Sequence, residues 1–159
     1  MTVSSRIPRI LLIEPPAVSP FGNQRIFGGN GSNKSDFRKP PLDLMMISGY
    51  LRKEGFDNDL LDANASRRTL DDIRVCIGRE KPDVVFFSTS TCTIYKDLLV
   101  AKAAHEMSPS ILTVAVGTHG PAGSQILKDL AKDTGGKYYE VRNAKALPKI
   151  FQREARRVA

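Results

Sequence analysis

Residues 82–120, PDVVFFSTSTCTIYKDLLVAKAAHEMSPSILTVAVGTHG, decide the fold class. This stretch begins with a β-branched and aromatic run at residues 84–87 and ends with a second apolar run at residues 111–116. Between the two runs, Ile94, Leu98, Ala101 and Ala104 recur at helical spacing, so the pattern predicts strand, helix and strand. Both predicted strands are continuously apolar, which is typical of parallel strands that helices cover on both faces.

Two loops follow the carboxyl ends of these strands, at residues 88–93 and 117–121. In parallel α/β sheets the ligand site lies beyond these ends, so the two loops form the candidate site. Small hydroxylic residues after a buried strand also make tight turns and cap the next helix. The residue types alone therefore leave a binding site and a purely structural turn as alternatives.

The rest of the chain repeats the alternation of strand and helix. Strands are predicted at residues 9–14 (RILLIE), 57–62 and 137–141 (KYYEV), in addition to the two central ones. Helices are predicted at residues 42–53, after a Thr69–Asp72 capping box, within 124–136, and at about 143–158. This order predicts an α/β three-layer sandwich with a five-stranded parallel sheet in the flavodoxin-like, or Rossmann-like, order 2-1-3-4-5.

Apolar spacing also predicts which helix faces turn inward. For the first helix the predicted buried face consists of Leu42, Met45, Met46, Tyr50 and Leu51. For the last helix it includes Leu147, Ile150 and Phe151, with Pro148 tolerated only near the first turn. We therefore expect the C-terminal helix to belong to the core, although residues 137–159 carry seven lysines and arginines against two glutamates.

A segment without apolar periodicity, residues 17–41, separates the first strand from the first helix. It is far longer than the usual strand-to-helix connection of about 2–6 residues, and such loops are typically functional or disordered. Its Gly28-Gly29-Asn30-Gly31-Ser32 run could cradle a phosphate, but the Lys-Ser/Thr ending of a phosphate loop is missing. We expect a mobile lid over the carboxyl ends of the strands.

Length and composition suit one α/β domain over residues 1–159. The two cysteines, Cys76 and Cys92, have no metal-ligand or redox spacing, so we expect a reducing, cytoplasmic setting and no metal site. No apolar run is long enough to span a membrane. The formal charge of +7 comes mostly from the last helix, and without interleaved aromatic residues we expect no nucleic-acid partner.

Residues 40–120 resemble the cobalamin-binding-type domain of cobalamin-dependent radical S-adenosylmethionine enzymes. The motifs are PPLDLMMISGYLRKEGFDNDLLDA, the Ser-x-x-Thr turn within DVVFFSTSTCTIYKDLLVAKA, and VAVGTHG in place of a Gly-Gly-Pro-His segment. The resemblance implies a small-molecule cofactor, cobalamin, at the carboxyl ends of the strands. The cofactor-binding residues that it implies are Ser88, Thr89, Ser90, Thr91, Gly117 and His119.

Two signatures of cobalamin enzymes are absent from the sequence. The Asp-x-His-x-x-Gly pattern that supplies a cobalt-ligating imidazole is missing, so His119 is not expected to ligate cobalt. The Cys-x-x-x-Cys-x-x-Cys run of radical S-adenosylmethionine enzymes is also missing. We therefore expect no catalytic residues and no enzyme activity from this chain alone.

The C-terminal part, residues 111–159, resembles the end of a von Willebrand factor A-type domain through LKDLAKDTGGKYYE and ALPKIF. That family's Asp-x-Ser-x-Ser metal motif is replaced here by Glu14-Pro15-Pro16, so no adhesion-type metal site is expected. Together the two resemblances imply a chimera, natural or engineered, of a cobalamin-binding-like part (1–110) and a von Willebrand A-like part (121–159), joined at about residues 111–120.

Two other groups of residues are candidates for a reactive or metal site. Cys92 and His119 could form a nucleophile and base in the crevice, but no orienting acid or oxyanion device is evident. Asp57, Asp59 and Asp62 could hold a cation, although solvation of an edge strand explains them as well.

Two functions remain open from the sequence. The first, which the sequence favours, is a non-catalytic chimeric scaffold with a cobalamin-binding-type crevice and no ligand. The second is the cobalamin-binding module of a radical S-adenosylmethionine methyltransferase-like system.

Overall fold

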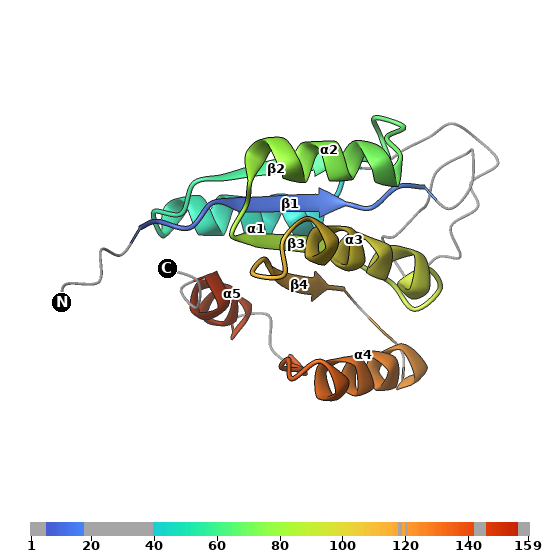
Figure 1. Cartoon of the computed structure of the whole chain (residues 1–159). Helices are drawn as coiled ribbons and strands as arrows, with labels where there is room; N and C mark the ends of the chain where they lie inside the picture. The colour runs from blue at the N-terminus through green and yellow to red at the C-terminus, as the bar shows by residue number, and fades with distance from the viewer. Residues whose placement is uncertain (1–5, 18–39, 118, 120, 142–145, 156–159) are drawn as a thin grey trace.

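Residues 6–17, 40–117, 119, 121–141 and 146–155 are described by the structure, a computed structural model (Figure 1). Most of the segment that was expected to form a mobile lid, including the glycine-rich run at residues 28–32, lies outside these described residues.

The described strands form one parallel sheet in the order β2-β1-β3-β4. Their bounds are β1 Ile10–Glu14, β2 Asn58–Asp62, β3 Val84–Ser88 and β4 Leu112–Val116. In the register of the sheet, Leu12 pairs with Leu60 on one side and with Phe86 on the other. The predicted parallel α/β sheet is confirmed, and its first four strands have the predicted order 2-1-3-4.

Helices cover both faces of the sheet (Figure 1). Their bounds are α1 Leu42–Lys53, α2 Leu70–Glu80, α3 Ile94–Met107, α4 Pro121–Asp133 and α5 Leu147–Ala155. Side chains that point to opposite faces of β1 and β3 enter two separate clusters, as strand geometry requires. Leu12 and Phe86 pack with α1 and α5, whereas Ile13 and Phe87 pack with α2 and α3.

The fifth strand that was predicted at residues 137–141 is absent from the described sheet, which has four strands. The two tyrosines of this segment are engaged by helices instead. Lys128 of α4 lies over the Tyr138 ring, and the Tyr139 hydroxyl donates to Glu154 of α5 at 2.6 Å. These contacts hold the segment against α4 and α5 rather than in a ladder with β4.

The inward face of α1 also differs from the prediction. Leu44, Ile47 and Leu51 are buried, whereas Met46 is 76% exposed. Leu42 and Met45 are exposed as well. The helix carries apolar residues around most of its circumference, so spacing alone fitted two stripes, and packing against Leu12 and Phe86 selects one of them.

Other local predictions are confirmed. The Thr69 hydroxyl accepts from the backbone N–H of Asp72, and the Asp72 carboxylate accepts from the N–H of Thr69, which completes the capping box of α2. In α5, Phe151 is only 6% exposed and meets the Phe86 ring edge-on, with 5.8 Å between ring centres. The C-terminal helix therefore joins the core.

Candidate functional site

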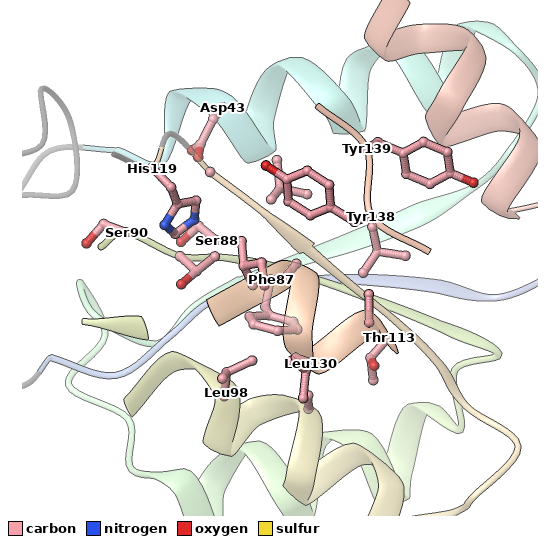
Figure 2. A pocket seen from close by; sticks show the side chains of 18 of the residues that line it. Asp43, Phe87, Ser88, Ser90, Leu98, Thr113, His119, Leu130, Tyr138 and Tyr139 are labelled. Atoms are coloured by element: carbon pink, nitrogen blue, oxygen red, sulfur yellow. The ribbon is translucent and has the colours of Figure 1, made fainter. Parts of the chain in front are cut away.

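A cavity of about 1360 Å³ begins at the carboxyl ends of β1, β3 and β4 and continues along β4 toward α4 and α5. Figure 2 shows His119, Ser88 and Ser90 toward one end of this cavity and Tyr138 and Tyr139 toward the other. The loops that follow β3 and β4 line the first end, which we call the mouth, defined by residues 88–92, 117 and 119. The topology thus brings the two predicted loops together.

All of the predicted cofactor-binding residues line the cavity. Three of them, Ser88, Thr89 and Ser90, are buried, while Thr91 and His119 are half-buried. Gly117 is exposed. Their convergence on one cavity follows from the parallel order of β3 and β4, because the carboxyl ends of neighbouring parallel strands lie at the same edge.

Part of this loop has a structural role. The carboxylate of Asp97, on α3, is fully buried and accepts from the Thr93 hydroxyl at 2.6 Å and from the Ser90 N–H at 3.4 Å. The hydroxyls of Ser90 and Thr93 lie 2.8 Å apart. These bonds fix the turn that leads into α3, so Ser90 has a structural role in addition to its place in the lining of the cavity.

A second buried carboxylate lies at the end of β1. The Ser88 hydroxyl donates to Oε2 of Glu14, and both residues are buried and line the cavity. Sequence analysis did not identify Glu14 or Asp97 as part of the site. Their positions offered one signal each, since Glu14 ends a buried strand and Asp97 follows Thr93 by one helical turn.

Two polar side chains at the mouth lack the hydrogen bonds that burial normally requires. Thr89 is 4% exposed, yet its hydroxyl has no partner among the described residues, and neither ring nitrogen of His119 has one there. The Thr89 backbone is satisfied, because its N–H donates to the Val116 carbonyl at 2.7 Å. Buried polar groups are usually paired, so these atoms are suited to a ligand that supplies the missing bonds.

Two glycines allow the backbone to lie close to the Thr89 carbonyl and the His119 ring at the mouth. A Cβ at Gly117 would lie 1.8 Å from the Thr89 carbonyl oxygen and 3.1 Å from Nε2 of His119. At Gly123, in the first turn of α4, a Cβ would lie 2.9 Å from Nδ1 of the same ring. The imidazole is therefore held between two glycine backbones.

Burial lowers the pKa of His119 below the ordinary histidine value of 6.5, and the opposing attraction of the Asp97 carboxylate is the smaller effect. The neutral imidazole, with one donor and one acceptor nitrogen, is therefore favoured near neutral pH.

The geometry does not support the reactive pair or the metal site that the sequence suggested. Cys92 and His119 line the same cavity, but Cys92 is exposed whereas both nitrogens of His119 are buried. No group of three or more metal-binding side chains occurs within the described residues, and Asp57, Asp59 and Asp62 form none. Within those residues, no helix has the length and apolar character that crossing a bilayer requires.

Comparison with protein families places this geometry in context. The model of the B12 binding domain matches residues 32–137, which is more than half of the chain. The chain belongs to the B12 binding domain family. The match covers the loops after β3 and β4 as well as α4.

Two curated relatives align with much of this chain. Over 114 residues the chain is 30% identical to the uncharacterized methyltransferase PH0819 of Pyrococcus horikoshii, covering 72% of the chain and 22% of that protein. Over 92 residues it is 35% identical to the anaerobic magnesium-protoporphyrin IX monomethyl ester cyclase of Rubrivivax gelatinosus, covering 57% of the chain and 17% of the cyclase. The chain thus spans about a fifth of these relatives.

A solved structure shows the same fold. The radical S-adenosylmethionine methyltransferase TsrM from Kitasatospora setae aligns with a TM-score of 0.62 at 15% identity, over 96% of this chain and 26% of TsrM. The comparisons do not show the resemblance of residues 111–159 to a von Willebrand factor A-type domain, and the B12 binding domain match continues across the expected junction to residue 137. That resemblance and the chimera stay predictions.

Proposed function

We propose that this B12 binding domain is the cobalamin-binding module of a radical S-adenosylmethionine methyltransferase-like system. The observation that carries the proposal is a pair of polar groups at the mouth that have no hydrogen-bond partner within the described part of the chain, the Thr89 hydroxyl and the His119 imidazole. Both lie beyond the carboxyl ends of β3 and β4, where ligands bind in parallel α/β folds. Membership of the B12 binding domain family supports cobalamin as the ligand. The similarity to the methyltransferases PH0819 and TsrM supports the methyltransferase-like setting.

The donor set fits the chemistry of cobalamin. The nucleotide tail of the cofactor is polar, and the hydroxyls of Thr89 and Thr91 with the imidazole of His119 would bind it. Gly117 leaves room because it has no side chain. The apolar wall of the cavity, which includes Val116 and Leu127, suits the less polar parts of a large cofactor. Bound cobalamin would supply a cobalt centre for radical or group-transfer chemistry.

The chain's own residues bind and orient rather than catalyse in this proposal. The buried Asp97 holds the loop at residues 90–93 in place, and Glu14 holds the Ser88 hydroxyl. The two cysteines of the sequence cannot supply the three that a radical S-adenosylmethionine cluster needs. We propose accordingly that these 159 residues have no enzyme activity by themselves, and that a partner region would supply the chemistry.

Titration with hydroxocobalamin tests the proposal, with gel filtration and a visible spectrum as the measurements. We expect red colour to elute with the protein in a one-to-one ratio. A colourless protein peak at saturating hydroxocobalamin would reject the cobalamin-binding module and leave the ligand-free scaffold hypothesis, which no comparison supports.

A pair of variants tests the role of the mouth. Thr89→Val removes the unpartnered hydroxyl with little change of shape, and we expect roughly 5- to 10-fold weaker binding, since one hydrogen bond contributes about 1 kcal/mol. Ser110→Ala also removes a hydroxyl, in the exposed turn between α3 and β4 outside the lining of the cavity, and should bind like the parent. Equal affinity of all three proteins would exclude the Thr89 hydroxyl from the binding site.

A further inference from the structure

Two side chains at the mouth carry atoms that ligate transition metals, the thiol of Cys92 and the imidazole of His119. We propose that Cys92, through Sγ, is the ligand that this chain offers to the cobalt of a bound corrinoid. This inference rests on the proposed function, and it replaces the imidazole ligand whose Asp-x-His-x-x-Gly pattern the sequence lacks.

The surroundings of His119 remove it as a cobalt ligand. Both ring nitrogens are buried, and the backbones of Gly117 and Gly123 lie against them on either side. A Cβ placed on Gly123 would already lie 2.9 Å from Nδ1 of His119. The space beside the imidazole is therefore too narrow for a planar macrocycle. His119 can therefore meet a narrow polar group, but a metal at the centre of a corrin stays outside its reach.

Cys92 has the opposite placement. Its side chain is exposed and lines the mouth, in the loop between β3 and α3. The loop is fixed on both sides of the cysteine, since the Thr93 N–H donates to the Ser90 carbonyl at 3.1 Å and the Thr93 hydroxyl donates to Asp97. Cys92 thus lines the mouth from a turn that hydrogen bonds hold in place, which suits a ligand for a large bound group.

An independent observation indicates that this cavity receives a ligand. The Thr89 hydroxyl is buried against the same cavity without a partner in the described part of the chain. It lies three residues before Cys92, on the same loop. The cysteine therefore belongs to a cavity with unmet hydrogen-bonding capacity and differs in this respect from Cys76, which lies half-buried on α2.

The coordination step balances without an external reagent. When the cobalt(III) of hydroxocobalamin meets the thiol, the Sγ–Co bond forms and the bond from cobalt to hydroxide breaks. The thiol proton and the hydroxide leave together as water. Neither sulfur nor cobalt changes oxidation state, so no oxidant or reductant is required.

The test compares the full chain with Cys92→Ser and with the matched control Cys76→Ser, each mixed with hydroxocobalamin in the absence of other thiols. Coordination by sulfur changes the visible spectrum of the bound corrinoid. We expect that change in the parent and in Cys76→Ser and its absence in Cys92→Ser. In the parent, hydroxocobalamin should also slow the alkylation of Cys92 by iodoacetamide at least tenfold, without slowing alkylation of Cys76.

The outcomes separate this inference from the proposed function. Red colour that elutes with all three proteins and shows one common spectrum would overturn ligation by Cys92 while leaving cobalamin binding intact. Unchanged alkylation of Cys92 in the cobalamin complex would overturn it as well. Absence of red colour from every protein peak would reject both.

Discussion

The centre of the sheet and its β4 flank are packed very differently. Every residue of β1 and of β3 is buried, whereas β4 has no buried residue and Ala115 is exposed. The two helices that follow β4 divide in the same way. Phe151 of α5 packs against the centre, while Leu130 of α4 is 37% exposed beside the cavity. Stability is therefore concentrated at the centre of the sheet, whereas the cavity extends from the strand ends along the β4 flank.

Side-chain size accounts for much of this difference. β1 and β3 place large apolar residues such as Leu12 and Phe86 on both faces, but β4 alternates valine and leucine with the smaller Thr113 and Ala115. Stabilisation by burial scales with the apolar area removed from water, at about 25 cal/mol per Å². The smaller side chains leave less area for α4 to cover, and the cavity occupies the remaining space.

The largest expected effect comes from removing the Phe151 ring of α5, which packs against the centre of the sheet. Phe151→Ala should lower the free energy of unfolding by about 3–5 kcal/mol, the usual cost of deleting a buried aromatic ring. Leu130→Ala, the matched change on α4, should cost less than about 1 kcal/mol because its side chain already contacts solvent. Urea unfolding of the two variants measures both values. Similar losses in the two variants would contradict the division into a tight centre and a loose flank.

A smaller effect is expected at Gly117, the position where the loops after β3 and β4 are closely packed. Gly117→Ala would bring a Cβ to 1.8 Å from the Thr89 carbonyl oxygen, so the two loops must move apart. We expect a loss of about 1–3 kcal/mol, the usual cost of overpacking. Gly49→Ala on α1, where a Cβ meets nothing within 4 Å, is the control and should not destabilise. Equal urea midpoints for the two variants would show that the loops tolerate separation.

The smallest effect is the pH dependence of the flank. Burial lowers the pKa of His119, so the unfolded chain binds the proton more tightly than the folded one. The contribution of this group is fully present above about pH 6.5 and is lost as the pH falls through the lower, folded value. His119→Gln should flatten the fall in urea midpoint below pH 6.5. A parent and His119→Gln with parallel pH profiles would contradict this assignment.

Strongly patterned segments were predictable from the sequence. The runs at residues 84–87 and 111–116 have the composition of buried parallel strands, and the capping box at Thr69 fixes the start of α2. The convergence of the two loops on one cavity follows from parallel topology alone. These features depend on local composition and on general rules of chain connection, and both are visible in one sequence.

Features that depend on tertiary competition were not predictable. Residues 137–141 have the composition of a strand, but the contacts of Tyr138 with Lys128 and of Tyr139 with Glu154 oppose pairing with β4. The apolar circumference of α1 allowed the wrong stripe to be chosen. Burial of Glu14 was also not predictable from its residue type, because a carboxylate at the end of a strand is usually solvated.

The flank leaves one edge of the sheet open. The Leu112 N–H donates to Asp83, and the Val116 carbonyl accepts from Thr89, so these residues turn their backbone groups toward β3. By alternation, the N–H and C=O groups of Thr113 and Ala115 point outward, where no described strand pairs with them. An open edge is a template for another extended chain. The net charge of +7 keeps copies apart, but salt at physiological strength screens charges beyond about 8 Å, so the tendency of this chain to self-associate should rise with ionic strength.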